Sequence, residues 1–192
     1  MQSSLPETAK RKYPRADALA VAREMVKWLR PHCERIICAG SLRRRKLEVG
    51  DVEILFIPKR LPRREGLFDI KWFEQTEIAF SAMLGGRLIE QRKSVRGSEC
   101  WGEKNRRAVH VPSGIPVDFF TATPANWFNY LVCRTGGMES NIKIAAAAQK
   151  KRWKWKPYGS GFINERGELV TVASEREVFE LAGLLFLEPW ER

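Results

Sequence analysis

The chain has 192 residues, 44% of them hydrophobic, which suits one compact domain or one domain with a smaller lobe. Lysine and arginine number 34 against 23 acidic residues, and the resulting formal charge of +11 favours a polyanionic partner such as nucleic acid. No segment has the unbroken apolar length of a membrane span, and residues 1–12 contain no apolar core like that of a signal peptide. We therefore expect a cytoplasmic protein that has no membrane partner.

The pattern of apolar residues predicts the elements of the first half of the chain. In chain order they are a helix over 15–30, a strand over 33–39, a short helix capped by Ser41, a strand over 50–58, a proline- and arginine-rich connector over 61–67, and a helix over 70–84. Gly40, Gly50 and Pro58 separate several of these elements, because each interrupts a regular backbone.

The second half combines strands, helices and a hairpin. Strands are predicted over 87–90, 106–111 and 115–120, helices over 124–134, 139–151 and 174–184, and hairpin strands over 161–164 and 169–171. Thr123 is predicted to cap one helix, and Ser174 with Glu177 forms the capping-box pattern of another. The predicted fold class is mixed α+β, with an antiparallel or mixed sheet flanked by helices and a small C-terminal lobe. The predicted divisions are a tail, a main domain and that lobe, over 1–12, 13–122 and 123–192.

Two carboxylates interrupt the apolar strand predicted over 50–58. Asp51 and Glu53 are two residues apart, so their side chains share one face of a strand while Val52 and Ile54 fill the other. Like charges held together on a buried strand are costly unless a cation neutralises them, and a hard divalent metal is the natural neutraliser. The alternative is an edge strand whose two carboxylates are solvated and have no function.

A third carboxylate, Asp118, lies among apolar residues in another predicted strand. Three acids on neighbouring strands can hold two magnesium ions close together, an arrangement used in phosphoryl and nucleotidyl transfer. The Gly40-Ser41 turn offers backbone N–H donors to a phosphate, and Arg43 or Arg44 adds positive charge. This half of the chain is therefore predicted to bind a nucleotide.

The order of these motifs resembles the nucleotidyltransferase superfamily pattern of Gly-Ser, a spacer, Asp-x-Asp/Glu and a later Asp. Within it, the stretch Gly40-Ser41-Leu42-Arg43-Arg44 resembles the family X DNA polymerases, those similar to polymerase beta. Thr135-Gly136-Gly137 followed by Asn141 is similar to that family's Thr-Gly-Ser turn and downstream asparagine, and the end of the chain resembles its terminal segment. The resemblance runs from about Tyr13 onward and implies a minimal form, a palm with a C-terminal thumb-like lobe that binds nucleotide and DNA.

The resemblance also implies roles for individual residues. Asp51 and Glu53 would ligate two Mg²⁺ ions, with Mn²⁺ as a substitute, and Asp118 would ligate the catalytic ion and help activate the primer 3′ hydroxyl. Arg44 would contact phosphates, and Asn141 the minor-groove edge of the incoming base. The residues implied to bind the nucleotide are Gly40, Ser41, Arg44, Arg15, Gly136, Gly137 and Asn141.

The sequence departs from the family pattern in ways that bear on the site. Cys133-Arg134 replace the aromatic pair that commonly checks the sugar 2′ position, so the choice between deoxyribonucleotides and ribonucleotides stays open. Pro116 replaces an arginine two residues before the third carboxylate. Glu53 stands where aspartate is common, and its longer side chain still ligates magnesium.

A basic and aromatic run follows the helix predicted over 139–151. The residues predicted to bind DNA are Lys150, Lys151, Arg152, Lys154 and Lys156. In this interpretation Trp153 and Trp155 stack on bases or sugars while the cations meet phosphates. The alternative is a solvated helix end whose tryptophans anchor the lobe.

These features predict a monomeric, template-directed DNA polymerase that adds deoxynucleotides to a primer 3′ end and fills short gaps in DNA repair. Its expected partners are primer-template DNA, gapped or nicked, and a nucleoside triphosphate. One alternative is a nucleotidyltransferase that works without a template or modifies a small molecule or protein. The other is a noncatalytic nucleic-acid-binding module, against which the three carboxylates argue.

Overall fold

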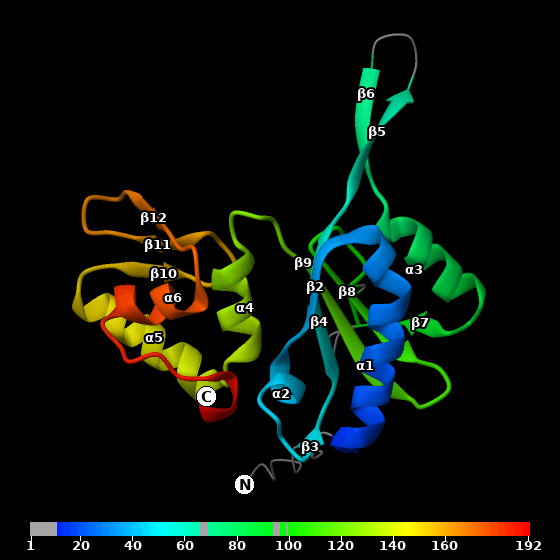
Figure 1. Cartoon of the computed structure of the whole chain (residues 1–192), viewed down its shortest axis with the longest axis horizontal. Coiled ribbons are helices and arrows are strands. Elements are labelled where there is room, and N and C mark those ends of the chain that lie inside the picture. The colour runs from blue at the N-terminus through cyan, green and yellow to red at the C-terminus, as the bar shows by residue number, and fades with distance from the viewer. Residues whose placement is uncertain (1–10, 66–68, 94–96, 99) are drawn as a thin grey trace, which may run out of the picture.

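The computed structural model describes residues 11–65, 69–93, 97–98 and 100–192 of the chain. The predicted tail over 1–12 lies almost entirely outside these residues. Figure 1 shows two lobes side by side, with a thin two-stranded arm projecting from the first. Within the described ranges, no helix combines the length and the apolar character needed to cross a bilayer.

A five-stranded mixed sheet forms the centre of the first lobe, in the order β2-β4-β9-β8-β7. Its strands are β2 (Cys33–Cys38), β4 (Val52–Pro58), β7 (Ile89–Gln91), β8 (Asn105–His110) and β9 (Ile115–Thr121). β4 and β9 run parallel, whereas the other neighbouring pairs run antiparallel. The predicted mixed α+β fold is confirmed.

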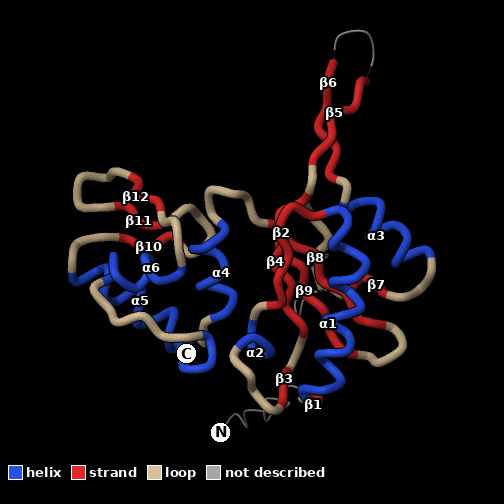
Figure 2. Tube along the Cα trace, viewed as in Figure 1, coloured by secondary structure: helices blue, strands red, loops and turns tan. Residues whose placement is uncertain are grey.

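The two faces of this sheet are covered by different parts of the chain. Helices α1 (Arg15–Leu29) and α3 (Thr76–Gly85) lie on one face, where Ile54 and Phe56 of β4 contribute to their core (Figure 2). Leu55 and Ile57 point to the other face and belong to a second core with Leu131 of α4 (Trp127–Thr135). Because strand residues alternate, Glu53 lies on the same face as Leu55, the face toward the second lobe.

Short elements close the end of the first lobe below the sheet. They are β1 (Tyr13–Pro14), α2 (Gly40–Arg43) and β3 (Glu48–Val49), with β1 and β3 paired. The 3-10 turn η1 (Arg30–His32) lies at the other end, where the Lys59 amide donates to the His32 carbonyl at 2.9 Å. The cap position of α2 is Ala39, and no side chain caps this helix. The prediction that Ser41 caps it is wrong, because the helical turn already begins at Gly40.

The second lobe packs three helices against a small antiparallel sheet, in the order β10-β11-β12. Its elements are α4, α5 (Met138–Lys150), β10 (Lys154–Lys156), β11 (Gly161–Ile163), β12 (Leu169–Thr171), α6 (Glu175–Ala182) and the 3-10 turn η2 (Pro189–Glu191). Ser174 caps α6 as predicted, since its hydroxyl accepts a hydrogen bond from the Glu177 amide at 3.1 Å. Thr123 does not cap α4; its amide donates to the Asn126 side chain at 2.7 Å, and Asn126 holds the cap position.

The region after β4 differs most from the sequence prediction. β5 (Arg60–Glu65) and β6 (Asp69–Glu74) form an antiparallel hairpin, and α3 begins only at Thr76. The connector predicted over 61–67 and the start of the helix predicted over 70–84 are therefore wrong. Residues 66–68 lie outside the described residues. Pro62 is compatible with β5 because this strand pairs on one side only.

Candidate active site

The parallel pairing of β4 and β9 brings two of the predicted carboxylates together. Glu53 lies directly opposite Asp118 in the register, so both side chains leave the same face of the sheet. Asp51 lies two residues earlier, just before β4 begins at Val52. The acids thus lie on neighbouring strands as expected, with Asp51 before its strand and not within it.

Gly40 makes room for Glu53 at the end of β2. The φ of Gly40 is +61°, and a Cβ atom at this position would lie 2.0 Å from Glu53 Oε2. The preceding amide, that of Ala39, donates to the Glu53 carbonyl at 2.8 Å. A side chain at position 40 would therefore meet both backbone strain and a direct collision, which explains why glycine precedes Ser41 here.

Glu53 is held in an electrostatically unfavourable place. Burial, together with the nearby charge of Asp51 and a smaller effect of Asp118, raises the pKa of Glu53 to about 7. The charges of Arg134 and Arg44 act in the opposite direction without restoring the ordinary value. A carboxylate in this state gains most from an added cation, because the cation offsets both the burial and the like charges.

Two arginines hold Asp118. Arg92 Nη2 donates to Asp118 Oδ1 at 2.8 Å, and Arg107 Nε lies 3.6 Å from Asp118 Oδ2. Arg107 lies opposite Asp118 in the β8–β9 register, whereas Arg92 follows β7 and reaches across β8. Neither arginine is predicted from the sequence. The family pattern places an arginine on the same strand as Asp118, at the position of Pro116, whereas Arg92 and Arg107 come from other parts of the sheet.

The donor set fits a hard divalent cation, although it is not gathered around one position. Among the described residues, no three His, Cys, Asp or Glu side chains are close enough to hold a metal ion as they stand. The Asp118 carboxylate is turned toward Arg92 and Arg107. The charges of Asp51 and Asp118 both act on the pKa of Glu53, so the three carboxylates are within electrostatic reach of one another, and oxygen donors are what Mg²⁺ prefers.

Of the arginines predicted near the phosphates, Arg44 joins the two lobes, whereas Arg15 makes its contact within the first lobe. Arg44 donates to the Thr135 carbonyl at 2.5 Å, and Arg15 to the Leu42 carbonyl at 2.6 Å. Burial lowers the pKa of Arg44, while the charges of Glu53 and Asp51 raise it, which places this guanidinium near the carboxylates. Arg44 and Arg15 thus flank the Gly40-Ser41 turn from two sides.

Arg43 joins the first lobe to the second. Its guanidinium donates to Thr135 Oγ1 at 2.7 Å and to both carboxylate oxygens of Glu175, at 2.5 and 2.9 Å. Arg192 donates to the same Glu175 carboxylate at 2.9 Å. The ends of α4 and α6 and the last residue of the chain are therefore tied to α2 by one network of charges.

The predicted glycine turn precedes α5 and faces Asn141. A side chain at Gly136 would displace that of Asn141, since a Cβ atom there would lie 2.8 Å from Asn141 Oδ1. Asn141 Nδ2 donates to the Cys133 carbonyl at 2.9 Å, so the asparagine spans the turn. Within the described residues, no group donates a hydrogen bond to the buried Asn141 Oδ1. Gly137 occupies the cap position of α5.

Arg134 stands at one of the two positions where the family pattern has an aromatic residue, and its guanidinium stacks on neighbouring rings. It lies 3.6 Å from the ring centroid of Phe120 on β9, and 5.2 Å from the rings of Tyr130 and Tyr158. Such stacking on ring faces is favourable, more so away from water. Its charge also lowers the pKa of Glu53, so Arg134 is a second-lobe cation within electrostatic reach of the carboxylates.

The basic run after α5 has exposed cations and inward-facing tryptophans. Lys154 and Lys156 point outward from β10, whereas Trp155 between them is buried and donates to Asn129 Oδ1 at 2.7 Å. Trp153 is half-buried and packs against Phe162. The interpretation in which these tryptophans stack on DNA is therefore wrong for Trp155. The structure favours the alternative of anchored tryptophans, and DNA contact by the cations stays a prediction.

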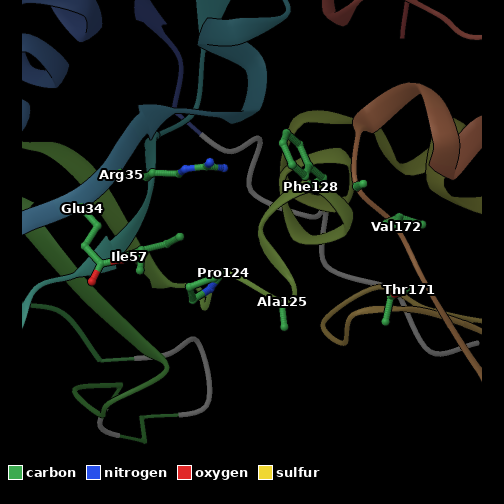
Figure 3. A pocket seen from close by; sticks show the side chains of 9 residues that line it. Glu34, Arg35, Ile57, Pro124, Ala125, Phe128, Thr171 and Val172 are labelled. Atoms are coloured by element: carbon green, nitrogen blue, oxygen red, sulfur yellow. The ribbon is translucent and has the colours of Figure 1, made fainter.

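One groove lies away from the carboxylates. It has a volume of about 580 Å³ and runs between the β2 edge of the sheet and the second lobe (Figure 3). Arg35 extends across it toward Phe128, with its guanidinium 5.7 Å from the ring. Asp51, Glu53 and Asp118 are not among the groove's lining residues. We therefore regard it as a seam between the lobes and not as the catalytic site.

Both lobes have similarities to known proteins. Residues 130–192 match the family model described as DNA polymerase beta thumb. Over 160 residues, the chain is 28% identical to Repair DNA polymerase X of African swine fever virus, from the pig isolate of Kenya, with 83% of this chain and 82% of the relative covered. The same identity and coverage hold for the proteins of that name from the tick isolate of Malawi and the Badajoz strain.

The thumb match and the carboxylate-bearing sheet beside it define the class of protein: a DNA-directed nucleotidyltransferase. Within that class the chain is similar to the family X DNA polymerases, in the form that combines a palm with a thumb. From here on the first lobe is called the palm and the second the thumb. Enzymes of this family generally use divalent metal ions, which agrees with the oxygen donors around Glu53.

Proposed function

We propose that this protein is a template-directed, Mg²⁺-dependent polymerase of the family X type that fills short gaps during DNA repair. The observation that carries the proposal is the register of Glu53 opposite Asp118, with Gly40 against Glu53 and the thumb on the same side of the sheet. The name of the viral relatives, Repair DNA polymerase X, supports a repair substrate.

The palm residues would hold the reacting groups. Asp51 and Glu53 are assigned to two divalent ions shared with the triphosphate, and Asp118 to the one nearer the primer. When bound, such ions lower the pKa of an attacking hydroxyl and neutralise the leaving group. The Gly40-Ser41 turn and Arg44 are assigned to the phosphates, for which Arg44 exchanges the Thr135 carbonyl for a phosphate oxygen.

The thumb residues would position the sugar and base. The backbone at Gly136-Gly137 is assigned to the sugar, because it can approach a ligand closely. Asn141 lies beside this turn, and its unsatisfied Oδ1 gains when the side chain turns toward a donor on the nucleotide. Binding of a nucleotide is therefore expected to exchange protein contacts of Arg44 and Asn141 for ligand contacts.

Single-nucleotide incorporation tests this proposal. The substrate is DNA with a one-nucleotide gap, presented with each of the four deoxynucleotides and ribonucleotides, with Mg²⁺, Mn²⁺ or a chelator. We expect incorporation that follows the templating base, needs the metal and is lost in Asp118→Asn. A matched control is Glu165→Gln, an exposed carboxylate in the turn between β11 and β12, which should leave incorporation unchanged.

Two outcomes would contradict the proposal. Extension that ignores the templating base would favour the template-independent alternative. DNA binding without incorporation in either the parent or Asp118→Asn would favour a noncatalytic binding module.

A further inference from the structure

The β5–β6 hairpin, named the arm below, is the feature that the proposed function leaves unexplained. Among the described residues its strands pair only with each other, and it projects beyond the end of the palm sheet (Figures 1 and 2). A lone two-stranded hairpin is at best marginally stable in water. Such an element is expected to gain order from a partner that lies along it.

The arm exposes apolar side chains that a soluble hairpin does not need. Trp72 is 66% exposed, Ile70 59% and Leu61 51%. Trp72 lies opposite Pro62 and Ile70 opposite Arg64, so these four residues share one face of the ribbon. That face presents a broad aromatic and aliphatic surface with an arginine beside it.

The face of the arm that carries Trp72 has a small excess of positive charge, which suits an anionic partner. On the face that carries Trp72, Glu74 is the acidic residue and it is already paired with Arg60, at 2.7 Å. Arg64 on the same face and Lys59 at the base of the arm add further positive charge. An arginine next to an exposed tryptophan is the combination that meets phosphates with the cation and sugars or bases with the ring.

We infer that the arm is a DNA-binding element that lies against the duplex flanking the gap. A two-stranded β-ribbon fits the major groove of B-DNA, and the +11 charge of the whole chain favours a polyanion over a second copy of the chain as its partner. The inference rests on the proposed function, since it takes DNA as the substrate. It adds a contact site outside the palm and thumb residues assigned above.

The position of the arm predicts how far from the gap it acts. The arm leaves the palm after Pro58, at the opposite end of β4 from Glu53. From Glu53 to Glu65, where β5 ends, the chain advances twelve residues, which at about 3.3 Å each is roughly 40 Å. At about 3.4 Å per base pair, the end of β5 is expected to reach duplex some twelve base pairs from the carboxylates.

Excision of the arm provides the first test. The backbone bond between the Gln75 amide and the Lys59 carbonyl closes the base of the arm, at 2.9 Å. Residues 61–73 can thus be replaced by Asn-Gly, which links Arg60 to Glu74 through a tight turn. Binding is measured on gapped DNA with flanks of six or twenty base pairs. We expect about tenfold weaker binding of the long-flank DNA only, since the six-base-pair flank does not reach the arm.

Point variants test the same surface without a change of chain length. Trp72→Ala and Arg64→Ala should each weaken binding of the long-flank DNA several-fold, and Arg64→Ala should reduce the salt slope by about 1. The matched controls are Trp28→Ala and Arg23→Ala. Both are exposed on α1, which covers the sheet face opposite the carboxylates, so neither should change binding.

The outcomes distinguish failure of the inference about the arm from failure of the proposed polymerase function. Incorporation into short-flank gapped DNA reports the proposed function, and it should be equal in the parent and the excised protein. Equal binding of long-flank DNA by the parent, the excised protein and Trp72→Ala would overturn the inference. So would a shift from dimer to monomer on excision without a change in DNA binding, because the arm would then serve contacts between copies.

Discussion

Glu53 lies where burial and two further carboxylates act on one group, and its pKa of about 7 has a consequence for stability. The folded protein holds a proton on Glu53 up to about pH 7, whereas an unfolded glutamate releases it near 4.5. Between these values the folded state binds more protons, so the free energy of unfolding falls as pH rises. Above pH 7 the loss is complete, and a bound cation offsets it.

Glu53→Gln should therefore stabilise the metal-free protein at pH 8 by up to about 3 kcal/mol, and have little effect near pH 4.5. Urea unfolding in the presence of a chelator, at both pH values, measures this difference. Added Mg²⁺ should stabilise the parent more than the variant. A variant that is less stable than the parent at pH 8 would show that Glu53 is not strained.

Arg92 is expected to position Asp118 and not to touch the substrate. Its guanidinium is 2.8 Å from the carboxylate, compared with 3.6 Å for Arg107. Arg92→Ala should lower kcat about tenfold with a small change in the KM for the nucleotide, equivalent to about 1.4 kcal/mol, and Arg107→Ala should lower it less. Single-turnover incorporation measures this, with Arg92→Lys as a partial rescue. A change confined to KM would place Arg92 on the nucleotide.

The sequence predicts that Asp51 and Glu53 share one face of a strand, because the alternation of side chains along a strand can be seen within a few residues. The preceding Gly40-Ser41 turn indicates that this face belongs to a nucleotide site. Arg92 is invisible to that reasoning. It approaches Asp118 across β8, so its role depends on the order of strands in the sheet, which no local spacing encodes. The same holds for Arg134, whose stacking on Phe120 joins two separate elements.

At the scale of elements, the ion pair between Arg43 of α2 and Glu175 of α6 joins the palm to the thumb. Burial raises the pKa of Glu175, but the hydrogen bonds and charges of Arg43 and Arg192 outweigh it and hold the pKa below its usual value. The stability that this pair contributes is therefore present at neutral pH and is lost as pH falls through the folded pKa.

Glu175→Gln should destabilise the protein at pH 7 by about 1 to 3 kcal/mol, because it leaves two half-buried arginines without their carboxylate. The difference should shrink as pH falls through the lowered pKa of Glu175, where the parent also loses the charge. Urea unfolding over a pH series from 7 downward measures it. Glu180→Gln on the exposed side of α6 is the matched control. Equal destabilisation at every pH of the series would argue against a charge effect.

The elements that the sequence predicts well are those with strong boundaries. Ser174 before α6 and the hairpin of β11 and β12 carry cap and turn residues that fix them locally. The arm was mistaken for a connector and a helix because Trp72 and Phe73 extend a helical pattern of apolar residues that truly begins only in α3. In the part of the chain that the structure describes, β5 and β6 pair with no third strand, so no neighbouring strand favours a hairpin over a helix at the sequence level.

At the scale of the whole molecule, the +11 charge predicts strongly salt-dependent DNA binding. The exposed cations Lys150, Arg152, Lys154 and Lys156 lie on one stretch of the thumb. If they meet four phosphates, the logarithm of the binding constant should fall with a slope of at least about 3.6 against the logarithm of salt concentration. Replacing all four by glutamine should reduce the slope by about that amount, as fluorescence anisotropy would measure. An unchanged slope would move the DNA contact elsewhere on the surface.

The direct pairing of β4 with β9 also constrains how the protein folds. Glu53 and Asp118 are distant along the chain, and the arm, α3, β7 and β8 are all made between them. Parallel pairing over such a separation closes a long loop and is slow compared with helix formation. During refolding, helical circular dichroism should therefore recover before nucleotide incorporation does. The pairing that brings Glu53 and Asp118 together is thus expected to form late in folding. Partly folded chains should then contain the helices but should not incorporate nucleotides.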